Sequence, residues 1–243
     1  MSKPTLVLLH GVGLDRTVWE PLAAIVEDRF EILAPDLPGH GEAPGVPDGV
    51  TLADLAAAVG AAIPERSHVV GFSLGALVAQ HLAIHRPDLV ATLTSVSSVC
   101  RRTDAERASV LGRLEVAERD VAASVEASIN RWFMSTDVSP EWVERTRATL
   151  LANHPESFLR CYRVFATGDA EVGPDLGLVT APALAITGQE DPGSTPEMTH
   201  RLAAAITGCR AEIVPNTRHM LPLERPGALA AAITSLIGDH AHV

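Results

Sequence analysis

Short apolar runs bounded by turn residues alternate with longer helix-like stretches along much of the chain. The segment Thr5-Leu6-Val7-Leu8-Leu9 is a mostly apolar run that stops at His10-Gly11. Such a run is typical of a strand buried on both faces of a sheet. By the same criterion, further strands are predicted over residues 31–34, 67–72, 90–96, 183–187 and 211–214.

Helices are predicted between most of these strands. One begins near Thr17, and another runs from a capping Thr51 to about Ile63, with Asp54 in place to complete a capping box. Others are predicted over 74–85, 196–206 and 226–237. Because repeated strand–helix units build a parallel sheet with helices on both faces, we predict an α/β fold with a mostly parallel, doubly wound sheet.

The alternation stops between residues 101 and 178, where no strand pattern occurs and helix-like stretches follow one another. Six of the nine Phe, Trp and Tyr residues lie in this segment. It leaves the predicted sheet after one strand and returns before the next. We therefore expect it to lie over the carboxyl edge of the sheet, where open α/β folds bind ligands. We call residues 101–178 the cap, and predict a core domain from residues 1–100 and 179–243.

Composition excludes several classes of function. The chain has 243 residues, 47% of them hydrophobic, which is enough for a sizeable core. Thirty acidic against 19 basic residues give a net charge of −11. This argues against nucleic acid or an anionic membrane as a partner, because both bind basic surfaces. Lys3 is the only lysine, so no internal lysine is available for Schiff-base or pyridoxal chemistry.

The cysteines Cys100, Cys161 and Cys209 are widely spaced and odd in number, so we expect reduced thiols rather than a zinc site or a disulfide framework. The first residues lack the pattern of a signal peptide, and no stretch of about 20 apolar residues occurs. We therefore expect a cytoplasmic protein. The sequence leaves its oligomeric state open.

A candidate nucleophile follows the strand predicted over 67–72. Gly71-Phe72-Ser73-Leu74-Gly75 matches the pattern G-x-S-x-G, which is weak alone but here follows a strand and opens a helix. A serine on such a strand-to-helix turn is lifted clear of the backbone, and small flanking residues let the turn close. We therefore predict that Ser73 is a nucleophile.

A serine hydroxyl needs a base, and the base needs an acid to hold its ring. His219 follows the last predicted strand and is the best-placed base, whereas His40 is expected to be structural. Asp191 follows the strand over 183–187 and is the expected acid, with Glu190 as its rival. The order Ser, Asp, His is the one that accompanies this type of turn.

Two further features complete the predicted site. The N–H of Leu74 and an N–H from the loop after the first strand, assigned to Val12, are expected to form an oxyanion hole. His81 and His85 are four residues apart on one predicted helix, but no third ligand is evident. We therefore expect neither a metal nor a cofactor.

Taken together, these motifs resemble the α/β-hydrolase family over nearly the whole chain. The resemblance rests on Leu9-His10-Gly11, the loop at 35–41, the serine turn at 71–75, Gly188-Gln189-Glu190-Asp191, and His219 followed by Glu224-Arg225-Pro226. In the cap, Arg131-Trp132-Phe133 and the segment at 158–162 are similar to 3-oxoadipate enol-lactonases and related carboxylesterases.

The chain departs from the family pattern in three places. It begins almost at the first strand, so the usual N-terminal hairpin is missing and about six strands are expected rather than eight. Arg218 stands where many members have a small residue before the histidine. Ala76 replaces the usual second glycine after the serine turn. None of these changes removes a group of the predicted triad.

The resemblance implies a serine hydrolase that cleaves a small carboxylic ester or lactone through an acyl-enzyme on Ser73. The leading specific candidate is 3-oxoadipate enol-lactone. Thioesterases, C–C bond hydrolases, acyltransferases and perhydrolases share this triad and stay open as alternatives, as does a ligand-binding sensor with a hydrolase fold. Dehalogenase and epoxide hydrolase activities are disfavoured, because those members carry Asp in place of Ser73.

The cap also contains candidates for the substrate pocket. Ile129, Trp132 and Phe133 are spaced to share one helix face. This face either packs the small core of the cap, or Trp132 and Phe133 contribute to the substrate pocket, with Trp132 as a roof over Ser73. Arg131 is then expected to point away, to solvent or to a carboxylate of the cap.

Overall fold

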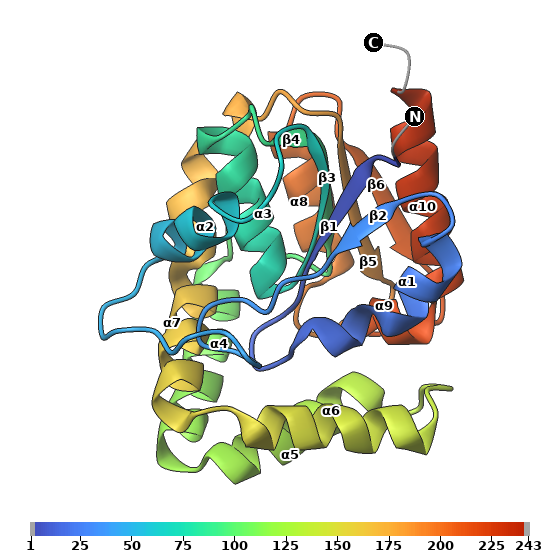
Figure 1. Ribbon diagram of the computed structural model, residues 1–243. Helices are drawn as coiled ribbons and strands as arrows, with labels where there is room; N and C mark the ends of the chain where they lie inside the picture. The colour runs from blue at the N-terminus through green and yellow to red at the C-terminus, as the bar shows by residue number, and fades with distance from the viewer. Residues whose placement is uncertain (1–2, 241–243) are drawn as a thin grey trace.

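Six parallel strands form one sheet at the centre of the computed structural model, which describes residues 3–240 (Figure 1). In the sheet they follow the order β2-β1-β3-β4-β5-β6. Every predicted strand is present, and no boundary differs by more than one residue. The strands are β1 (Thr5–Leu9), β2 (Glu31–Leu33), β3 (Ser67–Phe72), β4 (Val90–Val96), β5 (Ala183–Gly188) and β6 (Arg210–Val214). The predicted α/β fold class is therefore confirmed.

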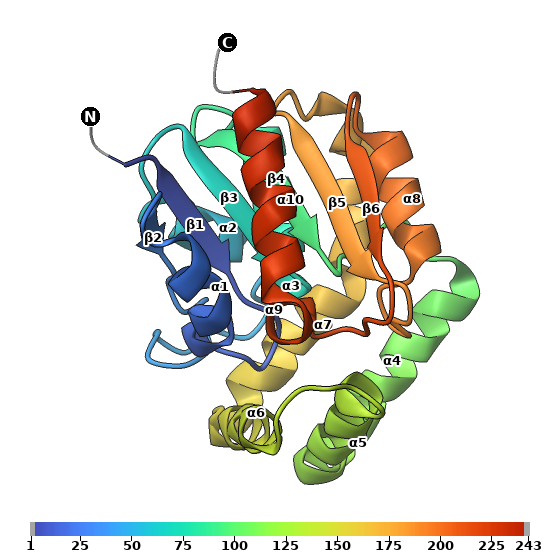
Figure 2. The same ribbon diagram turned by 90° about the vertical axis from the view of Figure 1, so that its right-hand side faces the viewer.

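The alternation of side chains along β1 divides the core into two layers. Leu6 and Leu8 belong to the cluster that contains residues of α1 and α10, whereas Val7 and Leu9 belong to the cluster with α2, α3 and α8. Figure 2 shows α1 and α10 in front of the sheet, with α2 and α3 behind it. The helices are α1 (Glu20–Val26), α2 (Leu52–Gly60), α3 (Leu74–His85), α8 (Pro196–Ala205) and α10 (Pro226–Asp239).

Local interactions explain where two of the helices begin. The Thr51 side chain accepts the Asp54 N–H, and the Asp54 carboxylate accepts the Thr51 N–H, which completes the predicted capping box. The helix expected from Thr17 is instead a 3₁₀ turn, η1 (Arg16–Trp19), followed by α1. Pro21 is the reason, because it has no N–H to donate and is tolerated only in the first turn of a helix.

The segment between β4 and β5 contains helices joined by loops, and two of these helices, α5 (Val121–Phe133) and α6 (Pro140–Ala152), lie beyond the carboxyl ends of the strands (Figure 1). Helix α7 packs against α2 and α3, so this end of the cap is fixed to the core. The inserted helical cap is thus confirmed, while its treatment as a separate domain over 101–178 stays a prediction. Its elements are α4 (Asp104–Arg119), α5 (Val121–Phe133), α6 (Pro140–Ala152), α7 (Pro155–Val172) and η2 (Gly173–Leu178).

A buried ion pair ties the start of the cap to α7. The Arg102 guanidinium and the Asp169 carboxylate are 2.7 Å apart, and both side chains are almost fully buried. Asp169 also accepts the Arg102 N–H at 2.7 Å and pairs with Arg107 at 3.0 Å. Burial lowers the pKa of Arg102, and the Asp169 charge opposes that effect. The residues just before α4 are therefore joined to α7 by the buried ion pair of Arg102 and Asp169.

We predict that Asp169→Asn lowers the free energy of unfolding by about 3–5 kcal/mol, because it leaves the Arg102 charge buried without a counter-charge. Urea unfolding followed by circular dichroism measures the change. Glu118→Gln is the matched control, because Glu118 pairs with Arg163 at an exposed site and its loss is expected to cost less than about 1 kcal/mol. Equal small losses in the two variants would contradict the assigned role of Asp169.

Candidate active site

The backbone at Ser73 is strained. Ser73 connects β3 to α3 with φ 54° and ψ −110°, a conformation that costs a non-glycine residue about 1–3 kcal/mol. Two backbone hydrogen bonds hold the turn: Ser73 N–H donates to the Val96 carbonyl at 2.9 Å, and Gly75 N–H donates to the His10 carbonyl at 3.0 Å. The serine is thus fixed between β4 and the loop after β1.

Glycines on either side of Ser73 allow this turn to close. A Cβ at Gly71 would lie 2.2 Å from the Gly75 carbonyl oxygen, and a Cβ at Gly75 would lie 2.2 Å from that of Leu9. Neither distance is possible for a side chain, so both positions require glycine. The two glycines of the G-x-S-x-G pattern therefore serve close contacts between backbones.

His219 and Asp191 meet at the carboxyl edge of the sheet, in the loops after β6 and β5. His219 Nδ1 donates to Asp191 Oδ2 at 2.7 Å. The other carboxylate oxygen of Asp191 accepts the N–H groups of Gly193 and Ser194, each at 2.9 Å. Burial alone would raise the pKa of Asp191, but His219 and these N–H donors outweigh burial and hold the pKa below its usual value. Asp191 is therefore a stable anion at the His219 ring.

The neighbouring carboxylate, Glu190, does not take part in this contact. Its side chain is exposed, and only its backbone N–H is bound locally, to the Thr217 carbonyl at 2.9 Å. Of the two rivals considered from sequence, the structure brings Asp191 to His219 and leaves Glu190 in solvent.

Aromatic rings enclose His219 on two sides. The Trp132 ring of α5 stacks on the imidazole at 5.4 Å between centroids, and the Phe72 ring lies 5.1 Å away. The His219 carbonyl accepts the Ser97 hydroxyl at 3.1 Å, so the backbone of the loop is also held. His219 consequently has little freedom to leave Asp191, and Trp132 shields it from bulk water.

Arg218, which departs from the family pattern, links the His219 loop to the cap. Its guanidinium donates from Nε and Nη2 to the Arg131 carbonyl at the end of α5, at 3.2 and 3.1 Å. Its N–H donates to the buried carboxylate of Glu224 at 2.9 Å. Burial raises the pKa of Glu224, and the backbone N–H donors oppose it. The larger side chain is thus used to position α5.

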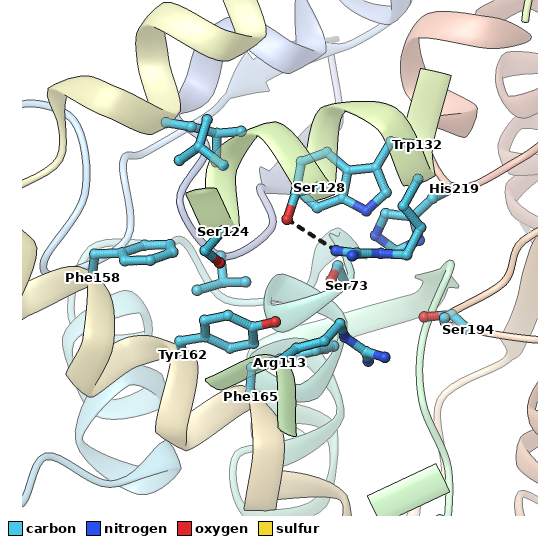
Figure 3. A pocket seen from close by; sticks show the side chains of 15 residues that line it. Ser73, Arg113, Ser124, Ser128, Trp132, Phe158, Tyr162, Phe165, Ser194 and His219 are labelled. Atoms are coloured by element: carbon cyan, nitrogen blue, oxygen red, sulfur yellow. Dashed lines mark hydrogen bonds between the residues drawn. The ribbon is translucent and has the colours of Figure 1, made fainter. Parts of the chain in front are cut away.

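A cavity lies between the carboxyl edge of the sheet and the cap, and its empty space, counted together with the part open to solvent, is about 550 Å³. Ser73 and His219 both face it, and Figure 3 shows the Trp132 ring above that of His219. The complete lining is Val12, Ser73, Arg113, Ser124, Val125, Ser128, Arg131, Trp132, Leu150, Phe158, Tyr162, Phe165, Gly193, Ser194 and His219.

The two N–H groups expected to bind an oxyanion have no acceptor within residues 3–240. Val12 follows β1 and lines the cavity, whereas Leu74 is the first residue of α3. An N–H at the start of a helix has no partner within that helix and favours negative charge. The geometry is compatible with an oxyanion hole, and the assignment of Val12 and Leu74 stays a prediction.

One face of α5 forms the cap wall of the cavity, and its residues correct the expected orientation of this helix. They are spaced one, four, seven and eight residues after the first: Ser124, Val125, Ser128, Arg131 and Trp132. Arg131 therefore faces the cavity instead of pointing away. Phe133 does not line the cavity and is buried in a core cluster, because the next residue on a helix is rotated by about 100°.

Sequence reasoning missed the residues that other cap helices supply. Arg113 comes from α4, and the aromatic residues Phe158, Tyr162 and Phe165 come from α7. The aromatic side chains were noted only as a cluster within the cap. No local pattern distinguishes a polar residue facing a cavity from one facing solvent, so Arg113 has no clear signal in the sequence.

The other candidate ligands lie away from the cavity. The His81 and His85 rings are 4.3 Å apart, with Glu171 4.0 Å from His81. Within residues 3–240, no three His, Cys, Asp or Glu side chains are grouped so as to hold a metal ion. Over the same residues, no helix has both the length and the apolar character needed to cross a bilayer.

All three cysteines are free thiols. Cys100 and Cys161 are buried, and burial raises their pKa values to about 11 and about 12. Cys209 is partly buried, and its pKa is also raised by burial, to about 11. These thiols are therefore protonated near neutral pH and are poor nucleophiles.

The chain is similar to known proteins over most of its length. A family model described as the alpha/beta hydrolase family matches residues 6–232. The chain is 30% identical over 225 residues to (E)-2-((N-methylformamido)methylene)succinate hydrolase of Acinetobacter baylyi, covering 91% of this chain and 85% of that protein. It is 26% identical over 244 residues to 3-oxoadipate enol-lactonase 2 of the same organism, covering 97% and 89%.

Among solved structures, the enol-lactonase from Burkholderia xenovorans superposes with a TM-score of 0.87. Its sequence is 24% identical, and the match covers 98% of this chain and 92% of that one. At this identity the likeness concerns the fold. The resemblance to α/β hydrolases and to 3-oxoadipate enol-lactonases noted from the motifs is confirmed.

Two buried histidines support the loop that carries Val12. His10 Nδ1 donates to the Gly11 carbonyl at 2.8 Å, and its Nε2 accepts the Leu37 N–H at 2.9 Å, so both nitrogens are used by a neutral ring. The His40 ring lies 5.1 Å away, edge to face. Burial lowers the pKa of His10 to about 4 and that of His40 to about 3, and the neighbouring His10 lowers the latter further. As expected, His40 has a structural place.

We predict that stability falls as the pH decreases from about 6.5 towards 4. An unfolded histidine takes up a proton near pH 6.5, whereas folded His10 and His40 stay neutral to lower pH. Each therefore contributes a loss of about 1.4 kcal/mol per pH unit across this window, and no loss above it. Urea unfolding at a series of pH values measures the slope.

His40→Gln should reduce that slope, because one of the two buried rings is removed. His200→Gln is the matched control, since His200 lies exposed on α8, and it should leave the slope as in the parent protein. A slope that is the same in all three proteins would show that the buried rings do not cause the acid sensitivity.

Proposed function

The chain belongs to the alpha/beta hydrolase family, and we propose that it is a serine hydrolase of small carboxylic esters or lactones. The observation that carries the proposal is the 2.7 Å hydrogen bond from His219 to the buried Asp191 carboxylate. It is made at the edge of a cavity that also contains Ser73 on its strained turn. A histidine held in this way, facing the same cavity as a serine, supports activation of that serine for acyl transfer.

In the proposed reaction, Ser73 Oγ attacks the substrate carbonyl while His219 takes the hydroxyl proton. Asp191 keeps the imidazole in the required tautomer and stabilises the imidazolium that forms. The N–H groups of Val12 and Leu74 bind the oxyanion of the tetrahedral intermediate. His219 then gives its proton to the leaving alkoxide, and an acyl-enzyme remains.

Water completes the cycle. His219 takes a proton from the water as it attacks the acyl-enzyme, and it returns that proton to Ser73 as the carboxylic acid leaves. These steps need no metal or organic cofactor. The enclosed position of His219 under Trp132 supports the proposal, because a water-poor site strengthens the electrostatic interactions that stabilise charge.

The space at Ser73 is confined between the sheet edge and the side chains of the cap, which favours a small substrate. Two relatives are named (E)-2-((N-methylformamido)methylene)succinate hydrolase and 3-oxoadipate enol-lactonase 2, and the second name supports a lactone as substrate. We therefore keep 3-oxoadipate enol-lactone as the leading specific candidate. A panel of lactones, short and long esters and thioesters separates this candidate from an open-chain ester or a thioester.

We predict that Ser73→Ala loses hydrolytic activity by roughly 10⁴- to 10⁶-fold, since it removes the nucleophile. The rate of hydrolysis of 4-nitrophenyl acetate measures the loss. The fold should persist, because alanine is smaller and the Ser73 side chain makes no capping hydrogen bond to α3 that would be lost. A fluorophosphonate should label the parent protein at Ser73 and leave the variant unlabelled. Full activity in the variant would overturn the triad.

We predict that Asp191→Asn loses about 10⁴-fold in kcat, because the amide cannot hold His219 in the productive tautomer. Glu190→Gln is the matched control: it neutralises the adjacent, exposed carboxylate and should leave kcat nearly unchanged. Steady-state kinetics on the same ester measure both. Equal losses would contradict the assignment of Asp191 as the residue that orients the base.

A further inference from the structure

Two arginines on the cavity wall lack a charged partner. Arg113 of α4 donates to Ser109 Oγ and Arg131 of α5 donates to Ser128 Oγ, each at 2.9 Å. The second of these bonds is drawn in Figure 3. No carboxylate of residues 3–240 lies within ion-pair distance of either guanidinium. Both side chains are only partly exposed, and both line the cavity that contains Ser73.

Most other arginines in the described chain are paired with Asp or Glu. The buried Arg102 has Asp169, and the half-buried Arg201 has Glu106. The remaining ones without a carboxylate are exposed or donate to backbone carbonyls, and they are Arg29, Arg66, Arg101, Arg119 and Arg218. Arg113 and Arg131 therefore differ from the other arginines, because each is partly buried and donates a hydrogen bond only to a serine hydroxyl.

The placement is costly for the protein on its own. A guanidinium that loses water without gaining an anion is destabilised, and a second cation nearby adds repulsion. Burial lowers the pKa of Arg131, and the Arg113 charge lowers it further. The chain has 30 acidic residues, but none of those in residues 3–240 is placed beside these two arginines.

The rest of the lining favours an anion. The cavity wall contains no Asp or Glu among residues 3–240. Asp191, behind His219, has both carboxylate oxygens occupied. The Ser194 hydroxyl is fully buried in the wall and has no partner there. In Figure 3, the Tyr162 hydroxyl points into the cavity between Ser124 and Arg113.

We propose that Arg113 and Arg131 form a carboxylate-binding subsite, and hence that the substrate is an ester or lactone carrying a free carboxylate. This inference rests on the proposed function. Because the subsite and Ser73 share one cavity, the carboxylate and the reacting carbonyl belong to one small molecule. A half-ester of a short dicarboxylic acid, or a lactone with a carboxylate side chain, has this chemistry.

The subsite also explains the choice of arginine. A guanidinium presents several N–H donors in a plane and binds a carboxylate through paired, charge-assisted hydrogen bonds. Arg131 is held in place by Ser128 and by its neighbour Trp132, whose ring lies 5.8 Å from the guanidinium carbon. The same helix face thus carries the group that binds the anion and the ring that covers His219.

Matched esters test the proposal. 4-Nitrophenyl hemiglutarate carries a carboxylate, and 4-nitrophenyl valerate is its neutral analogue of equal acyl length. The parent protein should prefer the anionic ester by at least about 10-fold in kcat/KM, since hydrogen bonds to charged groups contribute about 1.5–3 kcal/mol. Arg113→Gln and Arg131→Gln should each remove most of that preference, because each should raise KM for the hemiglutarate far more than KM for the valerate.

A second pair of esters identifies which part of the substrate carries the charge. Acetoxyacetate has its carboxylate on the alcohol part, and propyl acetate is the neutral analogue. A preference for hemiglutarate alone places the subsite on the acyl side, and a preference for acetoxyacetate alone places it on the alcohol side. No preference in either pair would overturn the proposal.

Binding to the Ser73→Ala variant separates this inference from the proposed function. Calorimetry should detect glutarate but not 1,5-pentanediol, and addition of Arg131→Gln should weaken glutarate binding by about 10-fold or more. Arg119→Gln is the matched control, because Arg119 is an exposed arginine on α4. It should change neither binding nor kinetics. Melting curves establish that each variant is folded.

The outcomes are distinct. Glutarate binding without turnover of any ester by the parent protein would refute the proposed function and leave the subsite in place. Turnover of neutral and anionic esters at equal rates, without glutarate binding, would refute the subsite and leave the serine hydrolase in place. Equal weakening of glutarate binding by Arg119→Gln and Arg131→Gln would also refute the subsite, because the loss would then come from the change in net charge and not from the position of Arg131.

Discussion

The candidate site depends on one constraint, which is the close backbone contact at the turn from β3 into α3. There the end of β3, the start of α3 and the end of β1 approach one another without room for a side chain. Gly71 and Gly75 leave room for carbonyl groups that any Cβ would displace, and this lets the chain pass through the strained conformation of Ser73. The same closeness brings the loop after β1 against the start of α3. The sheet holds Ser73 in this strained conformation, because β3 lies between β1 and β4 and is hydrogen-bonded to both.

A second close approach brings the other two groups together. A Cβ on Gly188, at the end of β5, would lie 2.2 Å from the Thr217 carbonyl, so the loops after β5 and β6 are in direct backbone contact. Asp191 and His219 lie on these two loops, 28 residues apart in sequence, and their hydrogen bond follows from that contact. Because the strands are parallel, the loops after β3, β5 and β6 all lie at one edge of the sheet. The glycines set how closely these loops approach their neighbours.

These relations explain what was predictable. Buried parallel strands are short apolar runs, so each was found to within a residue, and the helix over 74–85 has the predicted bounds. The contact of His219 with Asp191 followed from where the strands end. The side of α5 that faces the cavity did not, because periodicity separates apolar from polar faces and cannot tell a polar cavity from solvent. For that reason Arg131, which was expected to point away from the cavity, lines it, and Phe133, which was expected to line it, is buried in the core.

The charge distribution bears on how an anionic substrate would be selected. The net charge of −11 repels an anion at long range, but salt screens that repulsion beyond about 8 Å under physiological conditions. Recognition by Arg113 and Arg131 is therefore local and acts after entry into the cavity, where low polarity strengthens a guanidinium–carboxylate pair. Selectivity would then appear in how long the bound molecule stays and hence in KM, rather than in the rate of encounter. Two sheltered cations without a counter-charge destabilise the protein, and a bound anion removes that repulsion and desolvation cost. The same energetic cost therefore favours an anionic ligand over a neutral one.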